Sequence, residues 1–89
     1  MGVSQERRFV YVLRSKAEAE QQYVGLTSDV AARLKWHNEG PSGHTLHYRP
    51  WLVAVTIEFP TEQQARRFEK YLKSGSGRAF ARRHFAPQP

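Results

Sequence analysis

Cysteine is absent from the 89 residues of this sequence. Disulfide bonds, zinc sites with thiolate ligands and cysteine nucleophiles are therefore excluded. The fold must be held together by packing and hydrogen bonds, and the lack of cysteine fits a reducing compartment. We expect one small domain, because a chain of this length buries only about 60 to 65% of its unfolded surface and has no room for a second core.

Long hydrophobic runs are also absent. No apolar stretch approaches the roughly 18 residues that a membrane span requires, and the polar segment Met1 to Arg8 lacks the apolar core of a signal peptide. We therefore expect a soluble, cytoplasmic protein without a membrane partner.

Acidic residues are scarce and unevenly placed. Eight Asp and Glu stand against fourteen Lys and Arg, which gives a formal net charge of +6, and no acid follows Glu69. This excess favours a nucleic-acid partner over a basic protein that is merely soluble. Seven basic residues lie after Thr61, namely Arg66, Arg67, Lys70, Lys73, Arg78, Arg82 and Arg83.

Three stretches are rich in β-branched and aromatic residues, as strands are. Arg8–Arg14 has apolar side chains on both faces, which predicts a strand at the centre of a sheet. Gln22–Leu26 lies close enough along the chain to pair with it as a hairpin. Trp51–Phe59 alternates strongly, so we expect its odd-numbered residues, from Trp51 to Phe59, to face one side of the sheet.

A first helix is predicted from Asp29 to Glu39, with Thr27 or Ser28 as the N-cap. Gly40, followed by proline, is expected to end this helix in the left-handed conformation. The following stretch, Gly40–Pro50, has turn residues at both ends and is predicted to be an exposed loop. The apolar stripe of the helix is expected to consist of Val30, Ala31 and Leu34.

Two further helices are predicted near the end of the chain. Thr61 caps one that runs to about Ser74, and the sequence Gly75-Ser76-Gly77 breaks it. The other covers Arg78–Phe85 and is expected to turn Ala79, Phe80 and His84 toward the core. Residues 8–85 then form a single domain of the α+β class, between flexible ends at residues 1–7 and 86–89.

Several polar side chains occupy positions that suggest chemistry. Arg33 and His37 lie one helical turn apart on the same flank. Glu69 stands on the shoulder of its helix's apolar stripe, away from the solvated side. A surface that binds nucleic acid by stacking and phosphate contacts is expected from Trp36, His44, His47, Tyr48, Arg49, Lys73, Arg78, Arg82 and Arg83.

These residues together resemble the GIY-YIG nuclease family. Phe9-Val10-Tyr11 stands where the family has Gly-Ile-Tyr, and Tyr23-Val24-Gly25 is close to its second triplet. The phrase from Tyr71 to Arg78 resembles the small stand-alone bacterial members, which are related to the N-terminal domain of the excinuclease C subunit. The ordered set that carries the resemblance is Tyr11, Tyr23, Gly25, Arg33, His37 and Glu69.

The resemblance implies a three-stranded antiparallel sheet with the first strand at the centre and the order β-β-α-β-α-α. It also implies an endonuclease that hydrolyses phosphodiester bonds with one divalent ion. The implied substrate is structured or damaged nucleic acid, with DNA favoured over RNA. Relatives usually take their target selection from appended modules, so a protein partner that supplies it is also implied. The doubly apolar first strand agrees with the implied strand order independently.

The resemblance also implies roles for the residues of the set. Glu69 would be the sole protein ligand of Mg²⁺ or Mn²⁺, bound weakly without substrate, because Mg²⁺ dehydrates reluctantly. Arg33 would clamp the scissile phosphate with its planar fork of donors. Tyr23 would hold or deprotonate the attacking water, with His37 as the other candidate to accept the proton and Tyr11 orienting water or phosphate.

Structural interpretations stand beside these roles. Glu69 could pair with Arg66 or Lys73 on the helix surface, and Glu62 is a second candidate ligand. Arg33 could pair with Asp29, His37 could interact with the helix dipole, and both tyrosines could be core residues.

The chain also departs from some branches of the family. It has Leu26 where they carry lysine, and its only asparagine, Asn38, precedes Glu69. The main alternative is therefore a catalytically reduced nucleic-acid-binding module on the same fold. A subunit that interacts only with proteins is a third hypothesis.

Overall fold

The structure, a computed structural model, describes residues 7–41 and 43–86. Strands β1 (Arg8–Ser15), β2 (Gln22–Thr27) and β3 (Trp51–Phe59) form one antiparallel sheet in the order β2-β1-β3. The prediction of a central first strand is therefore confirmed. The flexible ends expected at 1–7 and 86–89 lie outside the described residues, except for Arg7 and Ala86.

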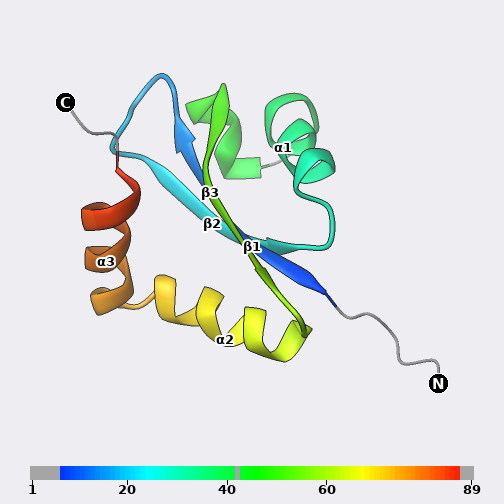
Figure 1. The fold of residues 1–89 in the computed structure, drawn as a ribbon. Helices are drawn as coiled ribbons and strands as arrows, with labels where there is room; N and C mark the ends of the chain where they lie inside the picture. Colours follow the sequence, from blue (N-terminus) through cyan, green and yellow to red (C-terminus); the bar gives the residue numbers. More distant parts are fainter. Residues whose placement is uncertain (1–6, 42, 87–89) are drawn as a thin grey trace.

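Helices cover both faces of this sheet, as Figure 1 shows. Helix α1 (Val30–Glu39) and a short 3₁₀ helix, η1 (Gly43–Tyr48), lie on one face, and α2 (Glu62–Leu72) and α3 (Gly75–Phe85) on the other. The α+β class and the element order are confirmed, with η1 as an addition to the expected list. Among the described helices, none is long and apolar enough to cross a membrane.

The central strand β1 divides the core into two parts. Val10 and Val12 pack against α2 and α3, where Ala65, Leu72 and Ala81 are buried. On the other face of β1, Tyr11 and Leu13 pack with Trp51, Tyr48, Val30 and Leu34. The apolar residues on both faces of the strand, read from the sequence, thus serve two separate clusters.

Strand β3 does not keep one face throughout, contrary to the expectation. The register shifts between Val12 and Leu13, which pair with Val55 and Val53 respectively and leave Ala54 as an extra residue. A bulge of this kind turns the following side chains to the other face. Trp51 therefore packs on the α1 side, whereas Val55 and Phe59 pack on the side of α2 and α3.

The ends of α1 differ from the predicted ones. Asp29, not Thr27 or Ser28, is the N-cap, and its side chain accepts a hydrogen bond from the Ala32 amide. Gly40 caps the C-terminus in an extended conformation with φ of −92°, so the expected left-handed stop is wrong. Close packing explains the glycine, because a Cβ there would come within 2.7 Å of Trp36 Cδ1.

The predicted boundaries of the last two helices also differ from those in the structure. Thr61 caps α2 as expected, but α2 ends at Leu72, two residues before Ser74. Ser74 is instead the N-cap of α3, so Gly75-Ser76-Gly77 forms the first turn of that helix. The buried residues of α3 are accordingly Gly77 and Ala81, whereas Ala79 and His84 are exposed.

Candidate active site at the edge of the sheet

The Tyr11 side chain reaches from the central strand toward the edge of the sheet. Its cross-strand partner on the edge strand β2 is Gly25. A Cβ added at Gly25 would come within 2.7 Å of Tyr11 Cε1 and closer still to its Cζ and hydroxyl. The missing side chain therefore leaves room for the Tyr11 ring to lie across β2, although Tyr11 is only 1% exposed.

Helix α1 contributes a buried histidine to the same place. Among its ten described residues only His37 is fully buried, whereas Ala31, expected in the buried stripe, is exposed. His37 Nε2 lies 3.0 Å from the Tyr11 hydroxyl, and Nδ1 lies 3.2 Å from the hydroxyl oxygen of Thr45. His37 and Thr45 are each 1% exposed, so this chain of polar contacts is internal.

Arg33 lies one turn before His37 on α1. Its guanidinium lies close enough to Tyr11 to lower the pKa of that phenol through a hydrogen bond and its charge, and it lies 4.4 Å from the centroid of the Trp36 ring. Such a cation–π contact contributes about 0.5 to 1 kcal/mol at an exposed site. Trp36 is half-buried and packs with its ring centroid 5.1 Å from that of His37. The face of the Trp36 ring thus packs against the Arg33 guanidinium.

Tyr23 adds a second phenol from β2. Its ring centroid lies 4.6 Å from that of His37 and 6.2 Å from that of Tyr11, and the side chain is half-buried. Side chains from β1, β2 and α1 therefore lie close together at this place. We call the group of Tyr11, Tyr23, Arg33 and His37 the tyrosine cluster.

The environment of Tyr11 changes its acidity. Burial raises the pKa of Tyr11, and interactions with Tyr23 and Glu69 act in the same direction. The hydrogen bond and positive charge of Arg33 lower the pKa without offsetting burial. Because an ordinary tyrosine already has a pKa of about 10, Tyr11 is a neutral phenol near pH 7. It can hold a proton in the site but is a poor base.

Glu69 approaches from the layer of α2 and α3. Its side chain is 18% exposed, and Oε2 accepts a hydrogen bond from Lys73 Nζ at 2.8 Å. The surface pairing considered as an alternative is therefore present. Glu69 is nevertheless close enough for its charge to raise the pKa of Tyr11. The carboxylate thus acts electrostatically on Tyr11, one member of the tyrosine cluster.

Glu62, the other candidate ligand, belongs to a different part of α2. It lies two turns earlier, about 10 Å along the helix axis, and forms ion pairs with Arg66 and Arg8. Within the described residues, no group of three or more His, Asp or Glu side chains could hold a metal ion. Of the two carboxylates, Glu69 is the one that affects the pKa of Tyr11.

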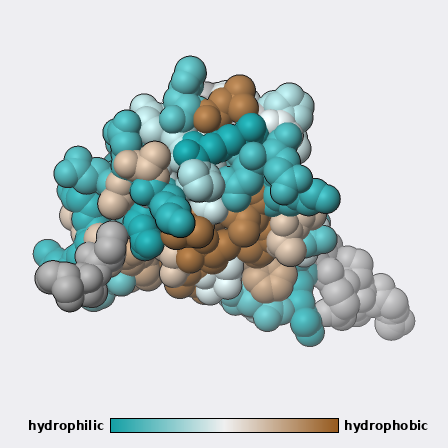
Figure 2. Space-filling view, turned by 90° about the horizontal axis from the view of Figure 1, so that it is seen from above, coloured by the Kyte–Doolittle hydropathy of each residue, from teal (hydrophilic) through white to brown (hydrophobic). Residues whose placement is uncertain are grey.

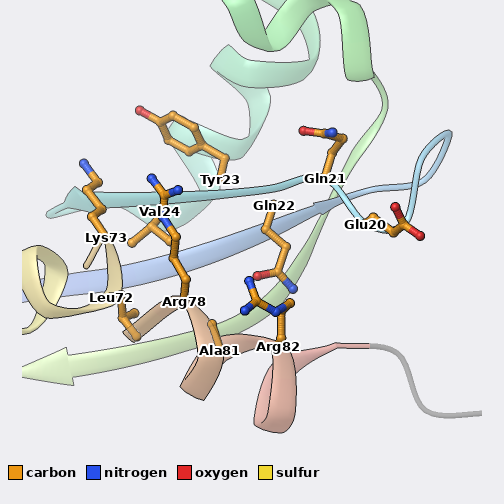
Figure 3. A pocket seen from close by; sticks show the side chains of 10 residues that line it. All are labelled: Glu20, Gln21, Gln22, Tyr23, Val24, Leu72, Lys73, Arg78, Ala81 and Arg82. Carbon is orange, nitrogen blue, oxygen red and sulfur yellow. The ribbon is translucent and has the colours of Figure 1, made fainter. Parts of the chain in front are cut away.

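A cleft of about 390 Å³ runs beside Tyr23, between β2 and the junction of α2 and α3. In Figure 3, Lys73 and Arg78 extend from the helices toward β2, and the Tyr23 ring lies at the same end of the cleft. Arg82 and Gln22 line its other end. Three of the basic residues expected to bind nucleic acid thus line one cleft, and two of them, Lys73 and Arg78, lie at the end beside Tyr23.

The remaining predicted binding residues are spread over other parts of the surface. His47 and Arg83 are exposed, but neither lines the cleft, and the side chain of His44 lies outside the described residues. Tyr48 packs on Trp51 with 6.3 Å between ring centroids. Arg49 donates to the backbone carbonyls of His37 and Gly40, so its guanidinium holds the end of α1.

Hydrophilic side chains cover most of the face shown in Figure 2, and hydrophobic surface is confined to smaller areas between them. The exposed large hydrophobic residues in the described part of the chain are Leu46, Leu52, Val53 and Tyr71.

Thr45 and Gln22 belong to the site but were not expected there. Gln22 lines the cleft two strand positions from Val24. Thr45 is buried because η1 folds back onto α1 and β3, where its carbonyl accepts a hydrogen bond from Trp51 Nε1 at 2.9 Å. Its stretch has turn residues at both ends, so no periodic signal in the sequence could have indicated that burial.

Known proteins resemble this chain both in sequence and in structure. Residues 7–83 match the family model described as the GIY-YIG catalytic domain. The UPF0213 protein BH0048 from Bacillus halodurans, solved by solution NMR, superposes with a TM-score of 0.53 at 28% identity. That match covers 91% of this chain and 88% of the Bacillus protein.

Two longer proteins are also similar in sequence. The structure-specific endonuclease subunit slx1 of Schizosaccharomyces japonicus is 42% identical over 64 residues, which are 66% of this chain and 23% of the relative. The structure-specific endonuclease subunit SLX1 of Meyerozyma guilliermondii is 34% identical over 77 residues, 80% of this chain and 26% of the relative. The chain thus spans about a quarter of the length of these relatives.

Gly25→Ala is expected to destabilise the protein by about 1 to 3 kcal/mol, because the added Cβ overlaps the buried Tyr11 ring. Gly75→Ala is the matched control. A Cβ at Gly75 meets nothing within 4 Å, so this change is expected to be neutral or stabilising by up to about 1 kcal/mol. Urea denaturation of both variants measures the difference, and equal stabilities would contradict the close approach of Tyr11 to Gly25.

Stability is expected to fall at high pH because of Tyr11. The folded state holds the phenol proton more tightly than the unfolded chain, whose tyrosine pKa is about 10. The contribution is therefore complete below about pH 10 and is lost as pH rises through the folded pKa. Urea denaturation between about pH 8 and 11 should show that the free energy of unfolding falls less in Tyr11→Phe than in the wild type. Equal decreases would contradict the raised pKa of Tyr11.

Proposed function

Because this chain belongs to the GIY-YIG family, we propose that it is an endonuclease that hydrolyses phosphodiester bonds in nucleic acid with one divalent ion. One observation carries the proposal. The charge of Glu69, from the layer of α2 and α3, raises the pKa of the same Tyr11 phenol that His37 contacts and Arg33 affects from the opposite layer. A carboxylate, a guanidinium and two phenols at one sheet edge supply the groups that phosphodiester hydrolysis requires.

The donor set at Glu69 fits Mg²⁺ or Mn²⁺. A hard ion that keeps most of its water needs one carboxylate and can take its remaining ligands from the substrate phosphate. Lys73 contacts Oε2 at 2.8 Å, so its positive charge competes with the ion for the carboxylate, which favours weak binding without nucleic acid. When bound, such an ion stabilises negative charge on the phosphoryl oxygens and lowers the pKa of water.

Arg33 is well suited to bind the scissile phosphate. Its planar guanidinium can form two parallel hydrogen bonds to phosphate oxygens, which the point charge of a lysine cannot. The contacts with Tyr11 and Trp36 hold the side chain in place before the substrate arrives. Little conformational entropy is then lost when the phosphate binds.

Tyr23 is the phenol that we assign to the attacking water. It is half-buried and lines the cleft, whereas Tyr11 is almost completely buried and holds its proton firmly. His37 is also buried, so a proton from the cleft would reach it through the hydroxyl of a neighbouring tyrosine. Tyr23 therefore orients the water, and Tyr11 and His37 support it from inside.

The cleft beside Tyr23 is the path that we propose for a nucleic-acid strand. Lys73, Arg78 and Arg82 would neutralise consecutive phosphates of a strand whose cleavage position lies at the tyrosine cluster. The two fungal relatives are named as structure-specific endonuclease subunits. We therefore propose branched or flapped DNA as the substrate class, with a protein partner that supplies target selection.

Glu69→Gln is expected to reduce cleavage of flapped DNA by about 1,000-fold, because the neutral amide holds the divalent ion poorly. Single-turnover cleavage with Mg²⁺ or Mn²⁺ measures the effect. Glu62→Gln is the matched control, since Glu62 lies on the same helix, also forms an ion pair and is expected to leave the rate unchanged.

Failure of the wild type to cleave any branched or flapped DNA, or cleavage unaffected by Glu69→Gln, would contradict the proposed activity. Tight binding of the same DNA by a wild type that does not cleave it would favour the nucleic-acid-binding module instead.

Removal of two cleft charges is expected to weaken the salt dependence of binding. Arg78→Gln combined with Arg82→Gln should lower the slope of log affinity against log salt by about 1.4 to 1.8. The control pair, Arg66→Gln with Arg67→Gln, removes the same charge from the exposed surface of α2 away from the cleft. Equal changes for both pairs, measured by fluorescence anisotropy with labelled flapped DNA, would contradict the proposed strand path.

A further inference from the structure

A row of polar contacts joins two members of the tyrosine cluster, Tyr11 and His37, to the buried side chain of Thr45. The Tyr11 hydroxyl lies 3.0 Å from His37 Nε2, and His37 Nδ1 lies 3.2 Å from Thr45 Oγ1. All three residues are 1% exposed. Both ring nitrogens of His37 therefore have a protein partner within hydrogen-bonding distance, and buried polar atoms of this kind keep such partners.

The hydrogen bonds of these three side chains fit one order of donors and acceptors. Arginine has only donors, so a hydrogen bond with Arg33, which lowers the pKa of Tyr11, uses the Tyr11 oxygen as acceptor. The single hydroxyl proton of Tyr11 remains available for donation to His37 Nε2. A neutral imidazole carries its one proton on the other nitrogen in that case, and Nδ1 donates to Thr45 Oγ1.

The position of Thr45 is fixed from two sides. Its backbone carbonyl accepts a hydrogen bond from the buried Trp51 Nε1 at 2.9 Å. Four residues later, the Arg49 guanidinium donates to the backbone carbonyls of His37 and Gly40 at the end of α1. The segment that carries Thr45 is thus anchored to β3 and to the helix that carries His37. These backbone contacts fix the distance between the Thr45 hydroxyl and His37 Nδ1.

We propose that Thr45 is a positioning residue that fixes His37 in the tautomer with its proton on Nδ1, so that Nε2 faces Tyr11 as an acceptor. In the opposite tautomer, Nε2 would donate to the Tyr11 oxygen. The hydroxyl proton of Tyr11 would then point away from His37, on the side of Arg33 and Tyr23. The effect on cleavage rests on the proposed function: Thr45 keeps the Tyr11 oxygen an acceptor for the guanidinium that binds the phosphate.

The tautomer can be observed directly. Long-range ¹H–¹⁵N correlation spectra of protein labelled with ¹⁵N-histidine, at about pH 8 where histidine is neutral, distinguish a protonated Nδ1 from a protonated Nε2. The wild type is expected to show the proton on Nδ1. In Thr45→Val, which keeps the shape but removes the acceptor, the fraction with the proton on Nε2 should rise. Thr45→Ser should retain the wild-type pattern.

Cleavage provides the second readout. The rate constant for flapped DNA with saturating Mg²⁺ is expected to fall about 10- to 100-fold in Thr45→Val, the range found when the hydrogen-bond partner behind a metal-binding histidine is removed. DNA affinity should be unchanged, and Thr45→Ser should restore most of the rate. A merely structural role would instead lower stability in proportion to activity, without a change of tautomer.

Several results would overturn the proposal. These are a wild type with the proton on Nε2, or a Thr45→Val variant whose His37 signals match those of the wild type. If Thr45→Val does not fold, the wild-type spectrum and Thr45→Ser still decide, because a changed tautomer in the serine variant would contradict the role of the hydroxyl. A tautomer shift in Thr45→Val supports the positioning role even if the wild type cleaves nothing, an outcome that would refute only the nuclease function.

Discussion

The passage of the Tyr11 ring across Gly25 is the constraint on which the rest of the site depends. Tyr11 lies on the most buried strand, yet its hydroxyl is 3.0 Å from His37 Nε2, and the charges of Arg33 and Glu69 affect its pKa. Any side chain at Gly25 would occupy the space of the ring. The phenol at the centre of the sheet can therefore contribute to chemistry at its edge because one strand position has no side chain.

This arrangement joins two layers that are otherwise separate. The sheet keeps the cluster of Val10 and Val12 apart from the cluster of Tyr11 and Leu13, and each has its own helices. Arg33, the proposed phosphate-binding group, comes from α1, and the carboxylate of Glu69 comes from α2 on the opposite face. Both affect the pKa of Tyr11, whose ring lies across the edge strand β2, and the cleft opens beside the same strand. A site of this kind is exposed to a long substrate while its supporting hydrogen bonds remain internal.

Much of the fold and part of the site could be predicted from residue patterns. Apolar side chains on both faces of β1 indicated its central place, and helical phase put Glu69 on the shoulder of α2, where it is 18% exposed. The errors occur where tertiary packing overrides local signals. The alternation in β3 is continuous in the sequence, but the bulge at Ala54 changes the face. Gly77 looks like a helix breaker, yet it lets α3 pack closely against the end of α2. The burial of Thr45 depends on contacts from α1 and β3 that no local pattern encodes.

In the proposed function, Glu69 and the tyrosine cluster form one metal and phosphate site. The most direct measurement is an NMR titration of the ¹⁵N- and ¹³C-labelled wild type with Mn²⁺, followed by inorganic phosphate. We expect paramagnetic broadening centred on Glu69 that extends to Tyr11, Tyr23 and Arg33, and a phosphate-dependent shift of the Arg33 guanidinium signal. Broadening centred on Glu62, or spread evenly over the acidic residues without a response at Arg33, would contradict it.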